Sequence, residues 1–211
     1  KPTGQPAFII RRLPVRFTFD NNYFNHRYQG VPIDGYTSIF ERMLDSELID
    51  LQTNMDFLAD KVSYMEEFPK IVYTGMIDAF FGYKYGELEY RSVRFESESF
   101  ESENIQGNAV INYTDAEIPF TRVMEWRHFD QKADKGKTIL TKEYQQDWDR
   151  TKEAYYPVND ARNSSLFKFY REEADKLQKI IFGGRLGNYQ YYDMDQVFGA
   201  ALKAVEKEFG K

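Results

Sequence analysis

Apolar residues recur at helical spacing in three parts of the chain. The first predicted helix spans 37–46, with Thr37 as its capping residue. The second runs from Asn163 or Ser164 to Leu177, with lysines and glutamates on its polar face. The third begins near Asp195 and keeps an apolar face to the end of the chain. Between these helices the periodicity changes to that of strands.

Short runs rich in β-branched and aromatic residues predict seven strands. They are Ile49–Gln52, Lys70–Thr74, Glu89–Ser97, Asn108–Tyr113, Thr121–Phe129, Thr138–Tyr144 and Ile180–Phe182. The four central strands follow one another through short polar turns, which favours an antiparallel sheet. The order of elements predicts an α+β fold, or an interrupted α/β unit that carries an inserted sheet.

Composition narrows the functional classes. The 211 residues include no cysteine, which excludes disulfides and thiolate chemistry, and only two histidines, which argues against a zinc site or a Ser-His-Asp triad. The formal charge of −6 disfavours nucleic acid as a partner. No apolar run approaches the ~20 residues that a membrane span needs. We therefore expect a cytoplasmic protein with no metal site, no nucleic-acid partner and no membrane partner.

Several segments could carry chemistry, and each has a plain structural alternative. Arg11, Arg12 and Arg16 lie among apolar residues, so each needs a partner, either an acid in an ordinary salt bridge or a ligand phosphate. The glycines around Arg185 lie between a strand and a helix, where they allow either close approach to a ligand or a simple turn. Their spacing is not that of the dinucleotide motif G-x-G-x-x-G.

Asp193 and Asp195 precede the last helix, where capping accounts for at least one of them. The tyrosines near both segments fit either a core or a set of hydroxyl donors. They are Tyr155, Tyr156, Tyr189, Tyr191 and Tyr192.

Taken in order, short motifs along the chain resemble the bacterial UDP-galactopyranose mutases. The motifs are Pro6–Phe17 (PAFIIRRLPVRF), Asp20–Phe24 (DNNYF), Arg27–Pro32 (RYQGVP), Gly35–Thr37 (GYT), Tyr73–Gly75 (YTG), Tyr90–Ser92 (YRS), Asn112–Thr114 (NYT), Pro119–Arg122 (PFTR), Tyr155–Asn159 (YYPVN), Gly184–Gly187 (GRLG) and Tyr191–Asp195 (YYDMD). The likeness extends from about Pro6 to the end of the chain. One departure is Met76, which stands where the family usually has proline.

The resemblance implies an FAD enzyme that interconverts UDP-galactopyranose and UDP-galactofuranose, a step toward galactofuranose in cell-wall polysaccharide. In the family, N5 of the reduced flavin is the nucleophile and forms an adduct with the sugar, so no protein side chain is expected to be catalytic. The implied substrate-binding residues are Arg12, Tyr23, Asn112, Arg122, Tyr156, Tyr191 and Asp193. The implied cofactor-binding residues are Gly75, Gly184, Arg185, Asp193 and Met194. Arg12 and Arg122 together would bind the diphosphate of UDP-galactose.

The resemblance also predicts the domain organisation. Residues 1–26 and 81–158 would form the antiparallel substrate domain. Residues 27–80 and 159–211 would form the carboxy-terminal part of a Rossmann-like FAD-binding domain. The family's glycine motif, helical domain and uracil-stacking tryptophan precede the matched region, and the chain opens without methionine. We therefore expect a fragment that is inactive alone and binds FAD weakly, with dimerisation as one way to cover its exposed apolar faces. The alternative is a noncatalytic nucleotide-sugar or carbohydrate-binding module.

Overall fold

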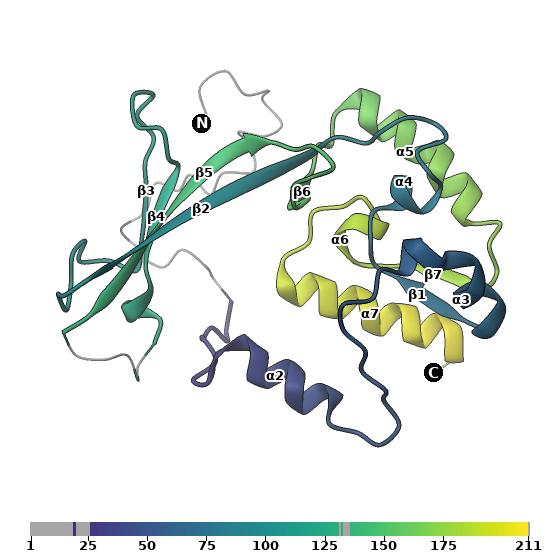
Figure 1. Cartoon of the computed structure of the whole chain (residues 1–211), viewed down its shortest axis with the longest axis horizontal. Coiled ribbons are helices and arrows are strands. Elements are labelled where there is room, and N and C mark those ends of the chain that lie inside the picture. Colours follow the sequence, from purple (N-terminus) through teal and green to yellow (C-terminus); the bar gives the residue numbers. More distant parts are fainter. Residues whose placement is uncertain (1–18, 20–25, 131, 133–135, 211) are drawn as a thin grey trace. The chain divides into compact units, whose positions relative to one another are not determined.

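The computed structural model describes residues 19, 26–130, 132 and 136–210. The contacts divide the chain into two units (Figure 1). Unit 1 comprises Lys1–Leu51 and Arg94–Gln145, and unit 2 comprises Gln52–Val93 and Gln146–Lys211. Each unit is thus built from two separate stretches of sequence. The domain boundaries given above remain a prediction.

Unit 2 is built on a pair of parallel strands, β1 (Ile71–Tyr73) and β7 (Ile180–Phe182), with Ile71 opposite Ile180 and Tyr73 opposite Phe182. Both strands were expected from their β-branched and aromatic residues, and both are confirmed. Around them lie a 3-10 helix, η1, and five helices. These elements are η1 (Phe57–Asp60), α3 (Lys61–Glu67), α4 (Ile77–Phe80), α5 (Ala161–Ala174), α6 (Gly184–Gly187) and α7 (Met194–Phe209).

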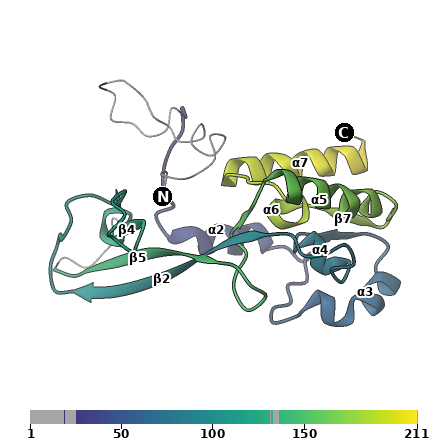
Figure 2. The same ribbon diagram turned by 90° about the horizontal axis from the view of Figure 1, so that it is seen from above.

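Aromatic rings form much of the core of unit 2. The rings of Tyr73, Phe80 and Phe182 meet with centroids 4.9 to 5.9 Å apart, in tilted or edge-to-face orientations. Helices lie to either side of the strand pair, and Figure 2 shows α7 on one side of strand β7 and α3 on the other. Leu58 and Met65, in the segment η1–α3, pack against this core, although the sequence patterns had not predicted that segment as helical.

The predicted cap of helix α5 is wrong by one turn. Asp160 caps this helix, because its carboxylate accepts a hydrogen bond from the backbone amide of Asn163 at 2.7 Å. Asn163 is instead fully buried and binds Glu89 through its side-chain amide. The sequence pattern could not distinguish Asp160 from Asn163 or Ser164, because aspartate, asparagine and serine are all good capping residues.

The central strands form one sheet in the order β3-β4-β5-β2-β6. The strands are β2 (Tyr90–Phe100), β3 (Val110–Asn112), β4 (Arg122–Glu125), β5 (Thr138–Asp147) and β6 (Tyr156–Pro157). Pairs β3–β4, β4–β5 and β2–β6 are antiparallel, which confirms the predicted sheet. Strand β4 is shorter than expected because the chain turns into a 3-10 helix, η2 (Trp126–His128). The segment 49–52 is not a strand.

Unit 1 also contains helix α2 (Gly35–Leu44), which confirms a helix in this segment. The predicted cap is wrong, because Thr37 lies inside the helix and Asp34 occupies the N-cap position, and the helix ends at Leu44 instead of Ser46. Large apolar side chains remain exposed on α2 and on α7, among them Phe40, Met43, Phe198 and Leu202. Within the part of the chain that the structure describes, no helix is both long and apolar enough to cross a membrane.

Candidate functional site

Two candidate cofactor residues lie at one edge of the parallel strand pair in unit 2. Gly75 follows strand β1, and Gly184 follows strand β7 and begins helix α6. Because the strands are parallel, both residues lie beyond the carboxyl ends, where open α/β sheets bind their ligands.

The glycines of this segment also have structural reasons of their own. Gly184 has a positive φ of 69°, which a residue with a side chain rarely adopts. A Cβ atom on Gly187 would lie 3.0 Å from the carbonyl oxygen of Tyr73, so this glycine lets α6 pack directly on β1. The simple turn is therefore sufficient to explain both glycines.

Arg185 lies on α6 and joins two segments that are distant in sequence. Its Nε and Nη2 atoms donate to the carbonyl oxygen of Tyr192 at 2.7 and 2.5 Å, and its Nη1 atom donates to the carbonyl oxygen of Tyr155 at 3.2 Å. The guanidinium carbon also lies 5.4 Å from the ring centroid of Tyr156 and 4.6 Å from that of Tyr191. Carbonyl oxygens and ring faces carry no full negative charge, and no carboxylate among the described residues forms an ion pair with Arg185.

The two tyrosines beside Arg185 form a stacked pair. The ring centroids of Tyr156, on strand β6, and Tyr191, in the α6–α7 loop, are 5.6 Å apart with an interplanar angle of 23°. Burial, followed by the negative charge of Asp193, raises the pKa of the Tyr191 phenol. At neutral pH Tyr191 is therefore a protonated hydrogen-bond donor. The structure thus brings together three candidate residues, Tyr156, Arg185 and Tyr191.

Asp193 and Met194 lie at the start of helix α7. Asp193 is the N-cap and shares a capping box with Gln196, whose side-chain oxygen accepts from the Asp193 amide at 2.8 Å. Of the two acids expected before this helix, Asp193 is therefore the cap, and Asp195 lies in the first helical turn. Met194 is the first helical residue and is 61% exposed.

In unit 1 the strand register brings two candidate substrate residues together. Asn112 on β3 lies directly opposite Arg122 on β4, and the Nε atom of Arg122 donates to Oδ1 of Asn112 at 3.2 Å. Glu143 lies 3.8 Å from the same guanidinium, while 44% of the Arg122 side chain remains exposed. Arg122 is thus oriented by its neighbours and still accessible to an anion. Arg12 and Tyr23 lie outside the described residues.

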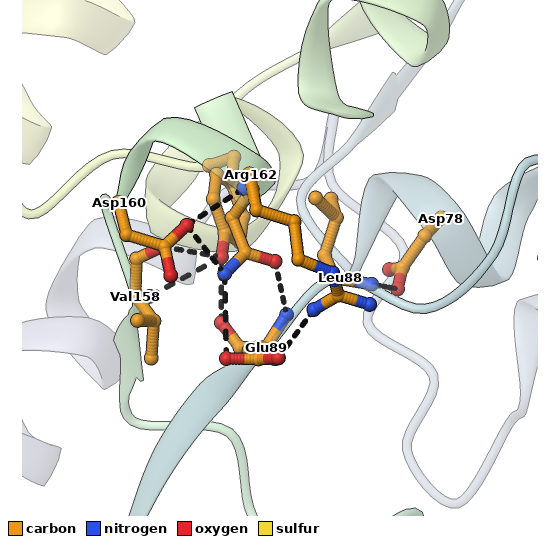
Figure 3. A network of polar contacts seen from close by, with 8 residues as sticks. Asp78, Leu88, Glu89, Val158, Asp160 and Arg162 are labelled. Atoms are coloured by element: carbon orange, nitrogen blue, oxygen red, sulfur yellow. Dashed lines mark hydrogen bonds and ion pairs between the residues drawn. The ribbon is translucent and has the colours of Figure 1, made fainter. Parts of the chain in front are cut away.

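The sequence patterns did not reveal two buried polar residues of unit 2, Asp78 and Asn163. Asp78 is fully buried and accepts hydrogen bonds from the amide of Leu88 at 2.9 Å and from the hydroxyl of Tyr90 at 3.3 Å. Glu89 is bound by Arg162 and by the buried Asn163, in the network that Figure 3 shows between Asp78 and Val158. The signal for Asp78 was a lone acid in an apolar segment, Met76–Phe81.

A metal site was not expected. Among the described residues, no group of three or more histidine, aspartate or glutamate side chains is arranged to hold a metal ion.

Comparison with known proteins identifies the family. The family profile described as UDP-galactopyranose mutase matches residues 1–191. A Klebsiella pneumoniae protein described as a probable UDP-galactopyranose mutase is 37% identical over 207 residues, which are 98% of this chain and 53% of that protein. An Escherichia coli dTDP-fucopyranose mutase is 34% identical, over 98% of this chain and 55% of its own length. A Mycoplasma genitalium UDP-galactopyranose mutase is 32% identical, over 94% of this chain and 52% of its own length. The chain spans about half the length of these relatives, and with a profile match over most of its residues it belongs to the UDP-galactopyranose mutase family.

Proposed function

We propose that the complete gene product interconverts the pyranose and furanose forms of a nucleotide-linked sugar, with UDP-galactose as the substrate. The observation that supports this best is the cluster of Tyr156, Arg185 and Tyr191 in unit 2. Two phenols and a guanidinium that has no ion pair among the described residues come together here from segments far apart in sequence, and they form a cationic surface with hydrogen-bond donors. Such a surface suits the diphosphate of a sugar nucleotide.

We also assign Arg122 to diphosphate binding, on the features of unit 1 alone. Arg122 is held by Asn112 and offers exposed N–H donors, and a guanidinium matches phosphate oxygens in pairs. The nearby Glu143 lowers the net charge at this position, so Arg122 alone is a modest anion site. This is consistent with the expectation that Arg12 completes the diphosphate contact.

Reduced FAD is the proposed cofactor, and the residues present fit it. Gly75 and Gly184 lie at the ligand-binding edge of the parallel pair, and the charge on Arg185 suits the negative charge of a reduced flavin. We propose that these three residues, with Asp193 and Met194, contact the cofactor. When bound, reduced FAD supplies the nucleophile for the anomeric carbon, and the protein supplies position and charge.

Within this reaction the side chains have distinct tasks. Tyr191, whose pKa is raised, stays protonated and donates to a phosphate oxygen instead of acting as a base. The Arg122 guanidinium stabilises the negative charge that develops on the diphosphate as it leaves the sugar. Asp193 accepts hydrogen bonds near the sugar while it caps helix α7.

The test is conversion of UDP-galactofuranose to UDP-galactopyranose by the complete gene product with chemically reduced flavin, followed by chromatography of the sugar nucleotides. Arg122→Ala should weaken UDP binding in a calorimetric titration by about tenfold or more, the usual cost of a lost charged contact. Arg171→Ala is the matched control, because Arg171 is an arginine on α5 whose side chain is 42% exposed and forms an ion pair with Asp175.

Two results would contradict the proposal. Equal UDP affinity in Arg122→Ala and the unaltered protein would exclude the diphosphate contact. Tight UDP binding without conversion under reducing conditions would favour the noncatalytic binding module. dTDP-fucopyranose is a second substrate to assay, because one relative carries that name. The 211-residue chain alone should bind FAD weakly, and a flavin band copurifying with it at near-equal stoichiometry would refute this expectation.

A further inference from the structure

Tyr189 is a buried tyrosine with an unusual set of partners. It is 4% exposed and lies in the loop between α6 and α7. Its hydroxyl donates to the carbonyl oxygen of Glu89 at 2.6 Å and accepts from the amide of Val158 at 3.2 Å, and the carbonyl oxygen of Val158 lies 3.0 Å from the same hydroxyl oxygen. One phenol therefore ties the α6–α7 loop to the start of β2 and to the end of β6, at the Glu89 and Val158 positions labelled in Figure 3.

The ring of Tyr189 is fixed independently of its hydroxyl. It stacks on Phe167 with centroids 5.6 Å apart, and it meets Tyr90 edge to face at 5.4 Å. The backbone of Tyr189 adopts a positive φ of 46°, which is uncommon for a residue with a side chain. This conformation persists where the surroundings hold the residue in place.

Together with Arg185, Tyr189 brackets the stacked tyrosine pair. Arg185 links the backbone at Tyr155 to the backbone at Tyr192, and Tyr189 makes its link at Val158. Tyr156 lies between the attachment points Tyr155 and Val158 on its own segment. Tyr191 lies between Tyr189 and Tyr192 on the α6–α7 loop. Each phenol of the pair is thus held by a cross-link on either side.

We propose that Tyr189 is a positioning residue for the mutase reaction, whose hydroxyl holds the loop bearing Tyr191 against strand β6 so that Tyr156 and Tyr191 reach one diphosphate together. The proposal rests on the function proposed above. Tyr189 itself has no contact with substrate in this scheme. Its effect is transmitted through the spacing of the two stacked rings.

The test is Tyr189→Phe in the complete gene product. This change keeps the ring that packs on Phe167 and Tyr90, and it removes only the hydroxyl. UDP binding, measured by calorimetry, should weaken by about tenfold, because the α6–α7 loop loses its attachment to β6. In turnover assays the change should appear mainly as a raised KM, since the misplaced groups bind substrate.

Tyr170→Phe is the matched control. Tyr170 is fully buried in the same unit, and its hydroxyl donates to the carbonyl of Gly86 at 2.6 Å and accepts from the amide of Tyr85 at 3.1 Å. Both variants lose a buried phenol hydroxyl, so both should lower the thermal unfolding midpoint to a similar extent. Only Tyr189→Phe should change UDP affinity. Equal UDP affinities for the two variants would overturn the proposal.

A double-mutant cycle separates positioning from general loosening. If Tyr189 acts through Tyr191, then Tyr189→Phe should weaken UDP binding much less in a Tyr191→Phe background than in the unaltered protein. Equal effects in both backgrounds would refute this route.

Tyr156→Phe and Tyr191→Phe distinguish failure of the inference from failure of the proposed site. If neither single variant weakens UDP binding, the site and the role of Tyr189 fall together. If both weaken it and Tyr189→Phe does not, only the role of Tyr189 is refuted.

Discussion

The buried carboxylate of Asp78 gives the sharpest test of how unit 2 is held together. Asp78 lies on helix α4 and is fully buried. It accepts from the backbone amide of Leu88 and the hydroxyl of Tyr90, two groups that are themselves buried. It therefore fixes the loop between α4 and β2 to the helix, across a stretch with little regular structure of its own.

The expected cost of Asp78→Ala follows from these partners. The alanine leaves the Leu88 amide and the Tyr90 hydroxyl unsatisfied, and each such buried group costs about 1–3 kcal/mol. Part of this cost is offset at neutral pH, because the alanine also removes a carboxylate whose burial is itself unfavourable. We expect a net decrease of about 2–4 kcal/mol in the free energy of unfolding. Asp78→Asn keeps one oxygen acceptor but places its N–H₂ group against a donor, and it should cost less.

Urea denaturation followed by tryptophan fluorescence measures this loss. Trp148 is a suitable probe, since its ring meets Tyr90 edge to face at 5.1 Å, and a Trp126→Phe background removes the other tryptophan. Asp147→Ala is the control, because Asp147 is exposed and pairs only loosely with Arg91 at 3.2 Å, so its loss should stay within about 0.5 kcal/mol. A loss below about 1 kcal/mol for Asp78→Ala would show that the Leu88 amide and Tyr90 hydroxyl are satisfied without the carboxylate.

Three further predictions concern charge and capping. Burial raises the pKa of Asp78 in the folded chain. As pH rises, Asp78 therefore loses its proton in the unfolded chain before it does so in the folded chain. The contribution of Asp78 to the free energy of unfolding is greatest below the unfolded pKa and declines as pH rises toward the folded pKa. The difference in unfolding free energy between the unaltered chain and Asp78→Ala should therefore widen as urea titrations move from pH 7 toward pH 4, and a constant difference would contradict the raised pKa. Hydrogen bonds from Lys84, and then from Lys176, lower the pKa of Glu173 to about 2, so its contribution is present above the ordinary glutamate pKa and is lost as pH falls toward 2. Glu173→Gln should flatten stability between about pH 4.5 and pH 2, measured by thermal melts, and an unchanged slope would argue against these ion pairs. Asp193→Ala should destabilise helix α7 by about 1 kcal/mol, whereas Asp193→Ser keeps a capping oxygen and should cost only a few tenths. If Asp193→Ser nevertheless weakens UDP binding as much as Asp193→Ala, the carboxylate has a role beyond the cap; circular dichroism and calorimetry on the same samples separate the two effects.

The regular elements could be predicted where the sequence pattern and the packing agree. Strands β1 and β7 are short runs of β-branched and aromatic residues, and the long strands of the antiparallel sheet follow one another through polar turns. The parallel pairing of β1 with β7 could not be predicted from local pattern, because the partners are separated by the whole of the sheet. The segment η1–α3 was missed for a similar reason, since the core decides which of its apolar residues are covered: Leu58 and Met65 pack against it, whereas Val62 is exposed.

The candidate site, too, could be predicted only in part from the sequence. The motifs indicated which side chains matter, and the structure shows Asn112 beside Arg122 and Tyr156 beside Tyr191, contacts that follow from strand register and loop path. No sequence pattern could indicate that Arg185 binds two backbone carbonyls, because carbonyl positions depend on the completed fold. The glycines near Arg185 suggested a ligand loop, and their geometry shows that close packing on β1 already requires one of them.

Substitutions should therefore act differently on the residues that would contact substrate and on the residue that positions them. Tyr156 and Tyr191 present hydroxyls, so a change at either removes a contact directly. Tyr189 instead binds backbone atoms of Glu89 and Val158 through its phenol, and such atoms are present whatever the side chain. These hydrogen bonds to backbone atoms would persist after almost any substitution at Glu89 or Val158. The geometry of Tyr156 and Tyr191 should then depend on the single hydroxyl of Tyr189 more than on the side chain at Glu89 or Val158. Replacing Val158 by alanine should accordingly leave UDP affinity nearly unchanged, and a loss as large as that of Tyr189→Phe would show that side-chain packing at Val158, and not the backbone hydrogen bond, holds the loop to strand β6.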